Sequence, residues 1–508
     1  MATHSDADTD VYREALIVSS PPVSLDPLVD RSDQAARDLG QLLYRRLLKL
    51  DAQATPTTDL AESWGVSGDG LAYRFTVKPG LRWSDGSPLT AKDVQATVAM
   101  VQAAGFPDAS LAATWHGVAA AIDATDTLTL TLPQPRASFA AAVADLPVLP
   151  AAALARLSPT TIEKSAARPL PTSGPFRVDS ADRTRVRLVP NRNATPAPQL
   201  HGIDLRLVRS FEAATQALAA GQVDGVVAAT PAQRAVLARL PGVRLHDVTT
   251  FRFVDLLLNQ RKAGLDDPAV RRAIATVVDR HQLITAALDG DARPQVSAFP
   301  AGIPWIVTPQ QELPSAALSG RALDAAGWVP GDDGVRHKGS TRLVFTLSVP
   351  DAAPLPAVAA ELARQLRGVG IAVSPTVVKP NAFEPSVLVP ESFDLAVADW
   401  DNGPDPDVSS FWRSNAAPPH GFNLSGGPPD PFLDRALDSL ATMTDTRLRR
   451  VAAAQVDARL SEDAPAVFLY APEVAVAVSD QLTGISIPPV GTSGSRFDGI
   501  AAWRRASS

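Results

Sequence analysis

Residues that could carry out chemistry are few and scattered along this chain of 508 residues. The seven histidines are His4, His116, His201, His246, His281, His337 and His420. None of them has a second histidine or a carboxylate at metal-ligand spacing. The absence of cysteine removes thiol nucleophiles, disulfides, Cys-ligated zinc and iron–sulfur clusters. The sequence also has no H-E-x-x-H, no P-loop, no G-x-G-x-x-G after a strand and no G-x-S-x-G elbow. We therefore expect no resident metal or cofactor, and a binding protein rather than an enzyme.

Composition narrows the class of protein further. Hydrophobic residues make up 45% and charged residues 20%, as in a folded protein. A net charge of −7 argues against nucleic-acid binding, which requires a concentrated basic face. The 45 prolines favour many fixed turns over a helical bundle. No stretch reaches the length of a membrane span, and the first residues resemble no signal peptide.

Hydrophobic periodicity indicates the elements that would position a binding site. Alternating or continuous apolar runs predict strands near 15–19, 73–78, 126–132, 186–188, 223–227, 251–259, 343–349, 371–373, 393–398 and 466–470. Helical spacing and cap residues predict helices over 33–48, with Ser32 as N-cap, and over 356–368, 431–443 and 446–460. Further helices are expected to begin after Thr90, Ser210 and Asp267. From about residue 175 onwards, strands and helices alternate, which is typical of an α/β fold.

One segment, 56–101, carries three turn and cap patterns in a fixed order. They are Leu60–Trp64 (LAESW), Asp69–Tyr73 (DGLAY) and Trp83–Val94 (WSDGSPLTAKDV). This segment resembles the oligopeptide- and dipeptide-binding proteins of bacterial ATP-driven importers, the extracytoplasmic solute-binding proteins of family 5. In that family these residues shape the fold and do not touch the ligand.

The resemblance extends over most of the chain. It includes Ser24–Pro27 (SLDP) before the first helix, Thr172–Phe176 (TSGPF), Val270–Ile274 (VRRAI) and the run from Asp394 through Trp400 to Pro406. It departs from the family where Arg45 and Arg46 replace the usual Glu-Gly. The Ala-, Arg- and Pro-rich composition suggests an actinobacterial member.

The resemblance implies an α/β, two-lobed fold of the periplasmic-binding-protein type (type II, cluster C) with an extra inserted domain. Lobe I would be discontinuous and comprise 11–45, 165–255 and 470–508. The inserted domain would comprise 46–164, and lobe II 256–469. Strands 251–259 and 466–476 are the candidates for the crossovers between lobes.

The same resemblance implies an extracytoplasmic receptor of an ABC importer. It would bind oligopeptides in an inter-lobe cleft and deliver them to permease subunits driven by cytoplasmic ATPases. We expect a monomer outside the cytoplasm, held at the membrane only by a lipid anchor upstream of Met1. Family members bind peptides as an added strand, with pockets for the side chains.

The candidate ligand-binding residues follow from this match. They are Val23, Ser24, Leu25, Trp305, Asp399, Trp400, Asp401, Asn402, Gly403, Asp405, Phe411, Trp412, Arg413 and His420. In the family, an aspartate shortly after the tryptophan pairs with the ligand's α-ammonium group. Asp401 and Asp405 are both candidates for this role, and Asp407 is expected to be a solvated turn residue. The aromatic residues are interpreted as pocket walls or, alternatively, as core packing. Arg413 would bind a ligand carboxylate or remain a surface charge.

Two alternatives to peptide transport stay open. The same fold could hold a non-peptide ligand such as a metal complex, haem, glutathione or an oligosaccharide, because fold does not determine ligand. The chain could instead be a cell-envelope regulatory lipoprotein without a transport role.

Overall fold

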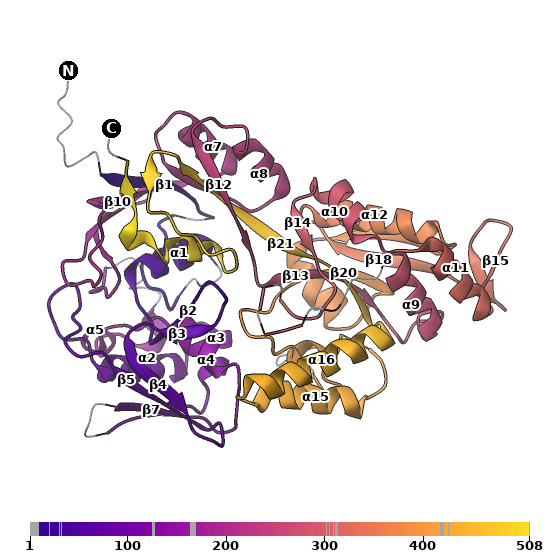
Figure 1. The fold of residues 1–508 in the computed structure, drawn as a ribbon, viewed down its shortest axis with the longest axis horizontal. Helices are drawn as coiled ribbons and strands as arrows, with labels where there is room; N and C mark the ends of the chain where they lie inside the picture. Colours follow the sequence, from indigo (N-terminus) through magenta and orange to yellow (C-terminus); the bar gives the residue numbers. More distant parts are fainter. Residues whose placement is uncertain are drawn as a thin grey trace. The chain divides into compact units, whose positions relative to one another are not determined.

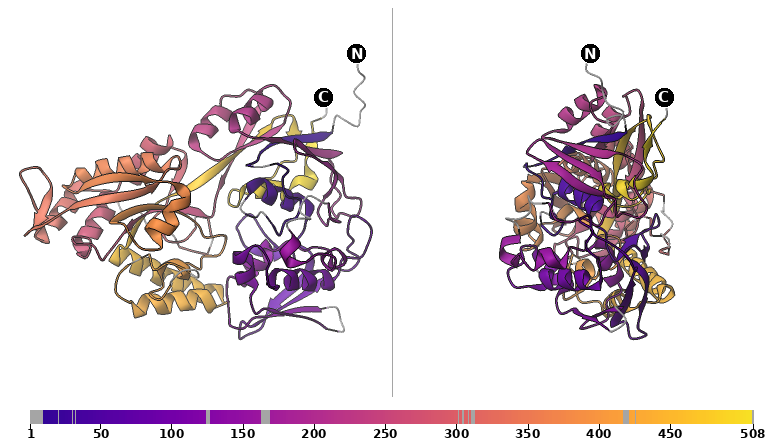
Figure 2. Two further views of the ribbon diagram at one scale, coloured as in Figure 1. Left: turned by 180° about the vertical axis from the view of Figure 1, so that it is seen from behind. Right: turned by 90° about the vertical axis from the view of Figure 1, so that its left-hand side faces the viewer.

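The computed structural model describes residues 10–19, 21–29, 31, 33–123, 127–162, 169–300, 302–303, 305–307, 309, 313–416, 421–424 and 426–506. Within these ranges, no helix has the length and hydropathy needed to cross a membrane. The chain divides into two compact units, and each combines helices with sheet (Figures 1 and 2). Unit 1 comprises Met1–Ala229, Gln233–Val248 and Val474–Ser508. Unit 2 comprises Thr230–Ala232 and Thr249–Glu473.

Strand β1 (Val11–Ile17) lies inside the main sheet of unit 1. It runs parallel to β10 (Gly202–Val208) along its whole length and also contacts β11 (Gly225–Ala228). The antiparallel strands β9 (Arg185–Pro190) and β8 (Phe176–Ala181) complete one side of the sheet. On the other side, β11 pairs with the last part of β21 (Ala466–Ser479), so the C-terminal residues return to unit 1.

The signature segment forms a second, four-stranded sheet in unit 1. Its order is β4-β5-β7-β6, with bounds Ala61–Val66, Ala72–Val77, Thr127–Thr131 and Ala119–Ile122. Helix α2 (Ala91–Gln102) begins with the predicted capping box: the backbone N–H of Thr90 donates to Asp93 at 2.8 Å, and Lys92 N–H donates to the Thr90 hydroxyl. These bonds satisfy amide groups that a helix start leaves without partners. The sequence-based interpretation of Thr90 as a cap is confirmed.

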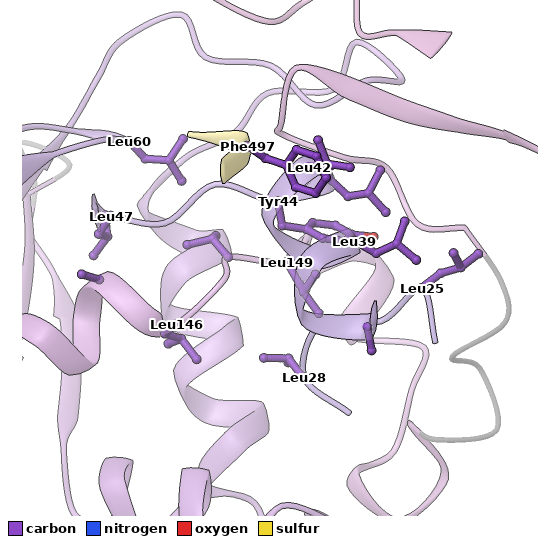
Figure 3. Packing of buried hydrophobic residues seen from close by; sticks show 14 of the residues in the cluster. Leu25, Leu28, Leu39, Leu42, Tyr44, Leu47, Leu60, Leu146, Leu149 and Phe497 are labelled. Atoms are coloured by element: carbon purple, nitrogen blue, oxygen red, sulfur yellow. The ribbon is translucent and has the colours of Figure 1, made fainter. Parts of the chain in front are cut away.

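Apolar side chains from both sheets and from α1 (Gln34–Leu43) form the core of unit 1. Figure 3 shows Leu39, Leu42 and Tyr44 of this region packed with Leu25, Leu149 and Phe497. Helix α1 is shorter than the predicted 33–48, and its N-cap is Asp33, whose side chain accepts from Ala36 N–H at 3.1 Å. Ser32, the predicted cap, lies outside the described residues.

The remaining elements of unit 1 are short. The helices are α3 (Ala109–Trp115), α4 (Phe139–Asp145), α5 (Ala151–Leu154), α7 (Phe211–Ala219) and α8 (Pro231–Leu237), the last of which begins with residues assigned to unit 2. The strands are β2 (Leu48–Leu50), β3 (Pro56–Thr58), β12 (Val243–Thr249, whose last residue lies in unit 2), β22 (Leu482–Thr483) and β23 (Arg504–Arg505).

Strands β13 (Arg252–Leu258) and β20 (Leu395–Asp401) are at the centre of the sheet of unit 2. They pair antiparallel over seven residues, from Arg252↔Asp401 to Leu258↔Leu395. β13 also pairs with the first part of β21, and β14 (Ala292–Pro294) pairs with β21 as well. On the other side of β20, the order continues to β18 (Val344–Pro350) and β19 (Ala372–Val378).

Helices pack on the two faces of this sheet in separate cores. One core holds α9 (Pro268–Val277), α10 (Arg280–Leu288), α11 (Ala316–Ala325) and α12 (Leu355–Arg367). The other holds α13 (Pro380–Phe383), α14 (Ser409–Trp412) and the paired helices α15 (Pro431–Thr442) and α16 (Thr446–Asp463). Figures 1 and 2 both show α15 and α16 side by side. Short strands β15–β17 (Val329–Pro330, Arg336–Lys338 and Thr341–Arg342) form a small separate sheet.

Candidate ligand-binding site

Strand β20 is paired unequally on its two edges. Its ladder to β13 continues to Asp401, whereas its parallel ladder to β18 covers only Leu395 and Ala396. Among the described residues, no strand therefore pairs with the β18-side edge of β20 from Val397 to Asp401. Val397 and Ala398 are buried, so only the end of this edge, from Asp399 to Asp401, reaches solvent. Unpaired N–H and C=O groups on an accessible strand edge are a template for another extended chain.

Trp400 lies beside this open edge and is held by a buried carboxyl group. Its indole Nε1–H donates to Oδ1 of Asp255 at 3.0 Å. Asp255 is fully buried, and its Oδ2 has no hydrogen-bond partner in the part of the chain that the structure describes. Burial raises the pKa of Asp255 well above the usual range of an aspartate, and the charge of Asp399 adds to the increase. Burial thus favours the neutral form of the carboxyl group that accepts the indole N–H.

Aromatic side chains surround Trp400. Phe411 lies 5.0 Å and Phe422 6.0 Å from it between ring centroids, and Phe253 contacts Phe411 at 6.3 Å. Only 8% of Trp400 is exposed, so most of its ring belongs to the core. Core packing therefore describes most of this side chain, and its role as a pocket wall stays a prediction.

The carboxylates at the end of β20 have different partners. Asp399 forms an ion pair with Arg252 of β13 at 2.5 Å. Burial raises the pKa of Asp399, while Arg252 opposes this increase. Asp401 is exposed, and its Oδ1 accepts from the Gly403 N–H at 3.1 Å. Gly403 has a φ of 66°, in the left-handed region that favours glycine.

The loop after β20 is fixed by internal bonds. Asp405, the second candidate for the ammonium partner, binds the guanidinium group of Arg449 on α16 at 2.7 and 3.1 Å. The Asn402 side chain donates to the Asp405 carbonyl at 2.7 Å. The interpretation of Asp407 as a solvated residue is wrong: it is half-buried and accepts from Ser409 N–H at 3.0 Å. Burial raises the pKa of Asp407, because the folded loop excludes water from its carboxyl group.

The other aromatic and basic candidates lie in different surroundings. Trp412 is 1% exposed and packs against Phe468, so it is a core residue. Arg413 forms an ion pair with Asp438 of α15. Trp305 is half-buried, and the Arg449 guanidinium lies 5.1 Å from its ring centroid. Arg449 therefore joins Trp305 to Asp405 and the loop after β20.

The remaining candidate residues belong to unit 1 or lie outside the described residues. Val23, Ser24 and Leu25 belong to unit 1 and are buried, and Leu25 packs into the core seen in Figure 3. His420 lies outside the described residues.

A cavity of about 230 Å³ in unit 2 was not predicted from the sequence. Its apolar walls include Leu388, Phe393, Phe422 and Leu424. Phe393 lies two residues before β20, and Phe422 is one of the two residues in ring contact with Trp400. No single stretch of sequence contains this cavity, because its walls come from residue 259 and from the separate segments 388–393 and 416–426. Over the described ranges, no group of three or more His, Asp or Glu side chains could hold a metal ion.

The comparison with protein families identifies the class of protein to which this chain belongs. The model "Bacterial extracellular solute-binding proteins, family 5 Middle" matches residues 55–421, which is most of the chain. The chain belongs to this family. Its members are extracytoplasmic binding proteins that bind peptides or other ligands and work with ABC permeases, and they are not enzymes.

Named relatives support the same assignment. Protein XP55 of Streptomyces lividans is 26% identical over 490 residues, covering 95% of this chain and 88% of that protein. The oligopeptide-binding protein AppA of Bacillus subtilis is 24% identical over 474 residues, covering 90% of this chain and 86% of that protein. The structure of AppA with a nonapeptide has a TM-score of 0.72 and covers 98% of this chain and 100% of that chain at 22% identity. That of CtaP from Listeria monocytogenes has a TM-score of 0.83 at 20% identity, with the same coverage of both chains. The predicted α/β solute-binding fold is confirmed.

Proposed function

We propose that this protein is the substrate-binding receptor of an ABC importer for oligopeptides. The observation that carries the proposal is the end of β20 beyond its ladder to β18, where Asp399 is half-buried and Asp401 is exposed. A peptide in extended form can add to such an edge through main-chain hydrogen bonds, which do not depend on its side chains. AppA, the relative described above, was solved in complex with a nonapeptide.

Asp401 would bind the positive end of the peptide. It is exposed at the end of the open edge, and only one of its oxygens accepts a backbone N–H. Asp405 is a weaker candidate, because both of its oxygens already bind Arg449. Asp399 is likewise paired, with Arg252. A charge-assisted bond from an ammonium group to a carboxylate contributes roughly 1.5–3 kcal/mol.

The cavity beside β20 would take an apolar side chain of the peptide. Its walls combine aliphatic and aromatic side chains with the polar Asn259, Glu391 and Asn423, and its volume of about 230 Å³ exceeds what a single large side chain requires. Through Phe422 it adjoins Trp400, so the backbone edge and the cavity are parts of one surface of unit 2.

The arrangement of the whole receptor belongs to the same proposal. Lobe I would comprise 11–45, 165–255 and 470–508, with 46–164 as its inserted domain, and lobe II would comprise 256–469. The receptor would act as a monomer with a lipid anchor, and would deliver peptide to permease subunits coupled to cytoplasmic ATPases.

Native mass spectrometry of protein purified from its own cells tests the ligand class. We expect added masses that fragment into amino-acid residues, because binding through the main chain accepts many sequences. A metal complex, haem, glutathione or an oligosaccharide as the bound mass would overturn the peptide assignment. Protein that is free of ligand and binds no peptide when mixed with a random library would instead favour the regulatory role.

A further inference from the structure

One face of the main sheet of unit 1 is strongly basic, although the chain as a whole has a net charge of −7. From Phe176 to Arg209 the sequence has seven arginines, no lysine and three aspartates. Strand register places five arginines on one face, which we call the basic face: Arg13, Arg177, Arg185, Arg187 and Arg206. These residues are not used by the ligand site in unit 2.

The register shows how closely these arginines lie. Arg13 of β1 pairs with Asp204 of β10, which pairs with Arg187 of β9. Two residues further along β10, Arg206 pairs with Arg185 of β9. Paired residues point to the same face, and neighbouring strands are about 4.8 Å apart. Helix α7 covers this face where Ala15 of β1 and Val208 of β10 are buried against it, so the open part of the basic face spans about 10 Å across β10, β9 and β8.

Two buried aspartates and Asp182, in the turn before Arg185, offset part of this charge. Asp204 forms an ion pair with Arg185. Asp224 binds Arg13 at 2.8 Å and Arg505 at 2.6 Å. Arg177, Arg185, Arg187 and Arg206 are all exposed to solvent. The Debye length is about 8 Å at physiological salt, so acidic residues elsewhere do not cancel this local field.

The guanidinium groups of the basic face are suited to binding phosphate groups that are arranged in a plane. Guanidinium groups form paired hydrogen bonds with phosphate oxygens. A specific protein partner would need an apolar or aromatic anchor at the centre of the contact. Of the large exposed apolar side chains identified among the described residues, one lies on this face, Ile17 of β1, at the end covered by α7, and none lies on β8, β9 or β10. We propose that the basic face binds a bilayer surface rich in anionic phospholipid headgroups.

This contact would add to the proposed lipid anchor without replacing it. Each arginine near an anionic membrane contributes about 1 kcal/mol, which corresponds to roughly a fivefold change in partitioning. Several weak contacts of this kind would orient unit 1 at the membrane and leave the peptide site of unit 2 unaffected.

Sedimentation of the full chain with vesicles tests the proposal. The protein should bind phosphatidylcholine vesicles that contain phosphatidylglycerol, and should be released when salt rises from about 0.05 to about 0.5 M. The double variant Arg177→Glu/Arg206→Glu should bind these vesicles at least tenfold more weakly. Its matched control is Arg321→Glu/Arg447→Glu, which changes two exposed arginines of unit 2 by the same charge.

Peptide affinity and the unfolding midpoint of each variant are measured in parallel. Both should stay at wild-type values, which separates this proposal from the proposed function. Equal losses in the two double variants, or equal binding to vesicles of phosphatidylcholine alone, would overturn it. Binding only to vesicles that carry the permease would also overturn it, in favour of an acidic protein surface.

Discussion

Two buried carboxyl groups in unit 2 differ in whether their surroundings stabilise the ionised form. Asp457 of α16 accepts from the Ser297 hydroxyl at 2.9 Å and from Ala298 N–H at 3.2 Å. Burial raises its pKa from the ordinary 3.8 to about 6, and these hydrogen bonds only partly oppose the increase. Asp405 is also shielded from solvent, but it binds the cation of Arg449. Asp457 therefore destabilises the folded state when it is ionised, whereas Asp405 is compensated.

We predict that Asp457→Asn stabilises the protein at pH 7.5 by about 1–3 kcal/mol. Between pH 4 and about 6 the folded state holds a proton that the unfolded state releases, so wild-type stability falls as the pH rises through this window. The asparagine variant has no such proton. Urea unfolding of both proteins from pH 4 to 7.5 measures the difference, which should shrink towards zero near pH 4. A difference that is constant with pH would contradict the prediction.

Arg496 links three segments of unit 1 through buried charges. It is fully buried and binds Glu14 of β1 at 2.5 Å and Asp38 of α1 at 2.8 Å. Arg496→Met would leave two carboxylates buried without a cation, so we expect a loss of about 3–5 kcal/mol in the free energy of unfolding. Arg504→Met, at an exposed residue nearby, is the control and should change it by less than about 0.5 kcal/mol. Equal unfolding midpoints for the two variants would refute the role of Arg496.

Elements formed by local signals could be predicted from the sequence. The capping box of Thr90 and Asp93 and the Asp267-Pro268 helix start depend on residues within one turn of each other, and the structure confirms both. Contacts between distant residues could not be predicted. Asp405 binds a guanidinium group 44 positions away, and Trp400 donates to a carboxyl group 145 positions away. The open edge of β20 likewise depends on where β18 ends in space, which periodicity does not encode.

The close approach of β11 to β1 gives a test at the scale of the sheet. A Cβ atom on Gly225 would lie 2.0 Å from the hydroxyl oxygen of Tyr12, which donates to Glu14. Tyr12 is fully buried and cannot move without breaking this bond. Gly225→Ala should therefore destabilise unit 1 by about 2 kcal/mol or more.

Gly65→Ala in β4 is the matched control for Gly225→Ala in β11. Nothing lies within 4 Å of its added Cβ, and its φ is not in the left-handed region. Its unfolding midpoint in urea should be close to that of the wild type. If Gly225→Ala unfolded at the same urea concentration as this control, the packing of β11 on β1 would be wrong.

At the scale of the whole chain, each of the two units is built from more than one segment of the sequence. Residues 474–508 belong to unit 1, although the preceding helices α15 and α16 belong to unit 2. Strand β21 carries the chain from one unit into the other. The candidate residues of unit 2 gather around β20, so the ligand chemistry can be tested by variants in that unit alone.

Calorimetric titration of one oligopeptide, with a free and with an acetylated N-terminus, is the most direct test of the receptor assignment. Asp401→Asn removes the charge of the candidate carboxylate and keeps an oxygen for the Gly403 N–H. Its control is Asp332→Asn, at an exposed turn residue of unit 2. We predict that wild type and Asp332→Asn bind the free peptide about 10- to 100-fold more tightly than the acetylated one. Asp401→Asn should bind both peptides with the same reduced affinity. Failure of the wild type to bind either peptide, or an equal preference for the free amine in all three proteins, would contradict an oligopeptide receptor that recognises its ligand at Asp401.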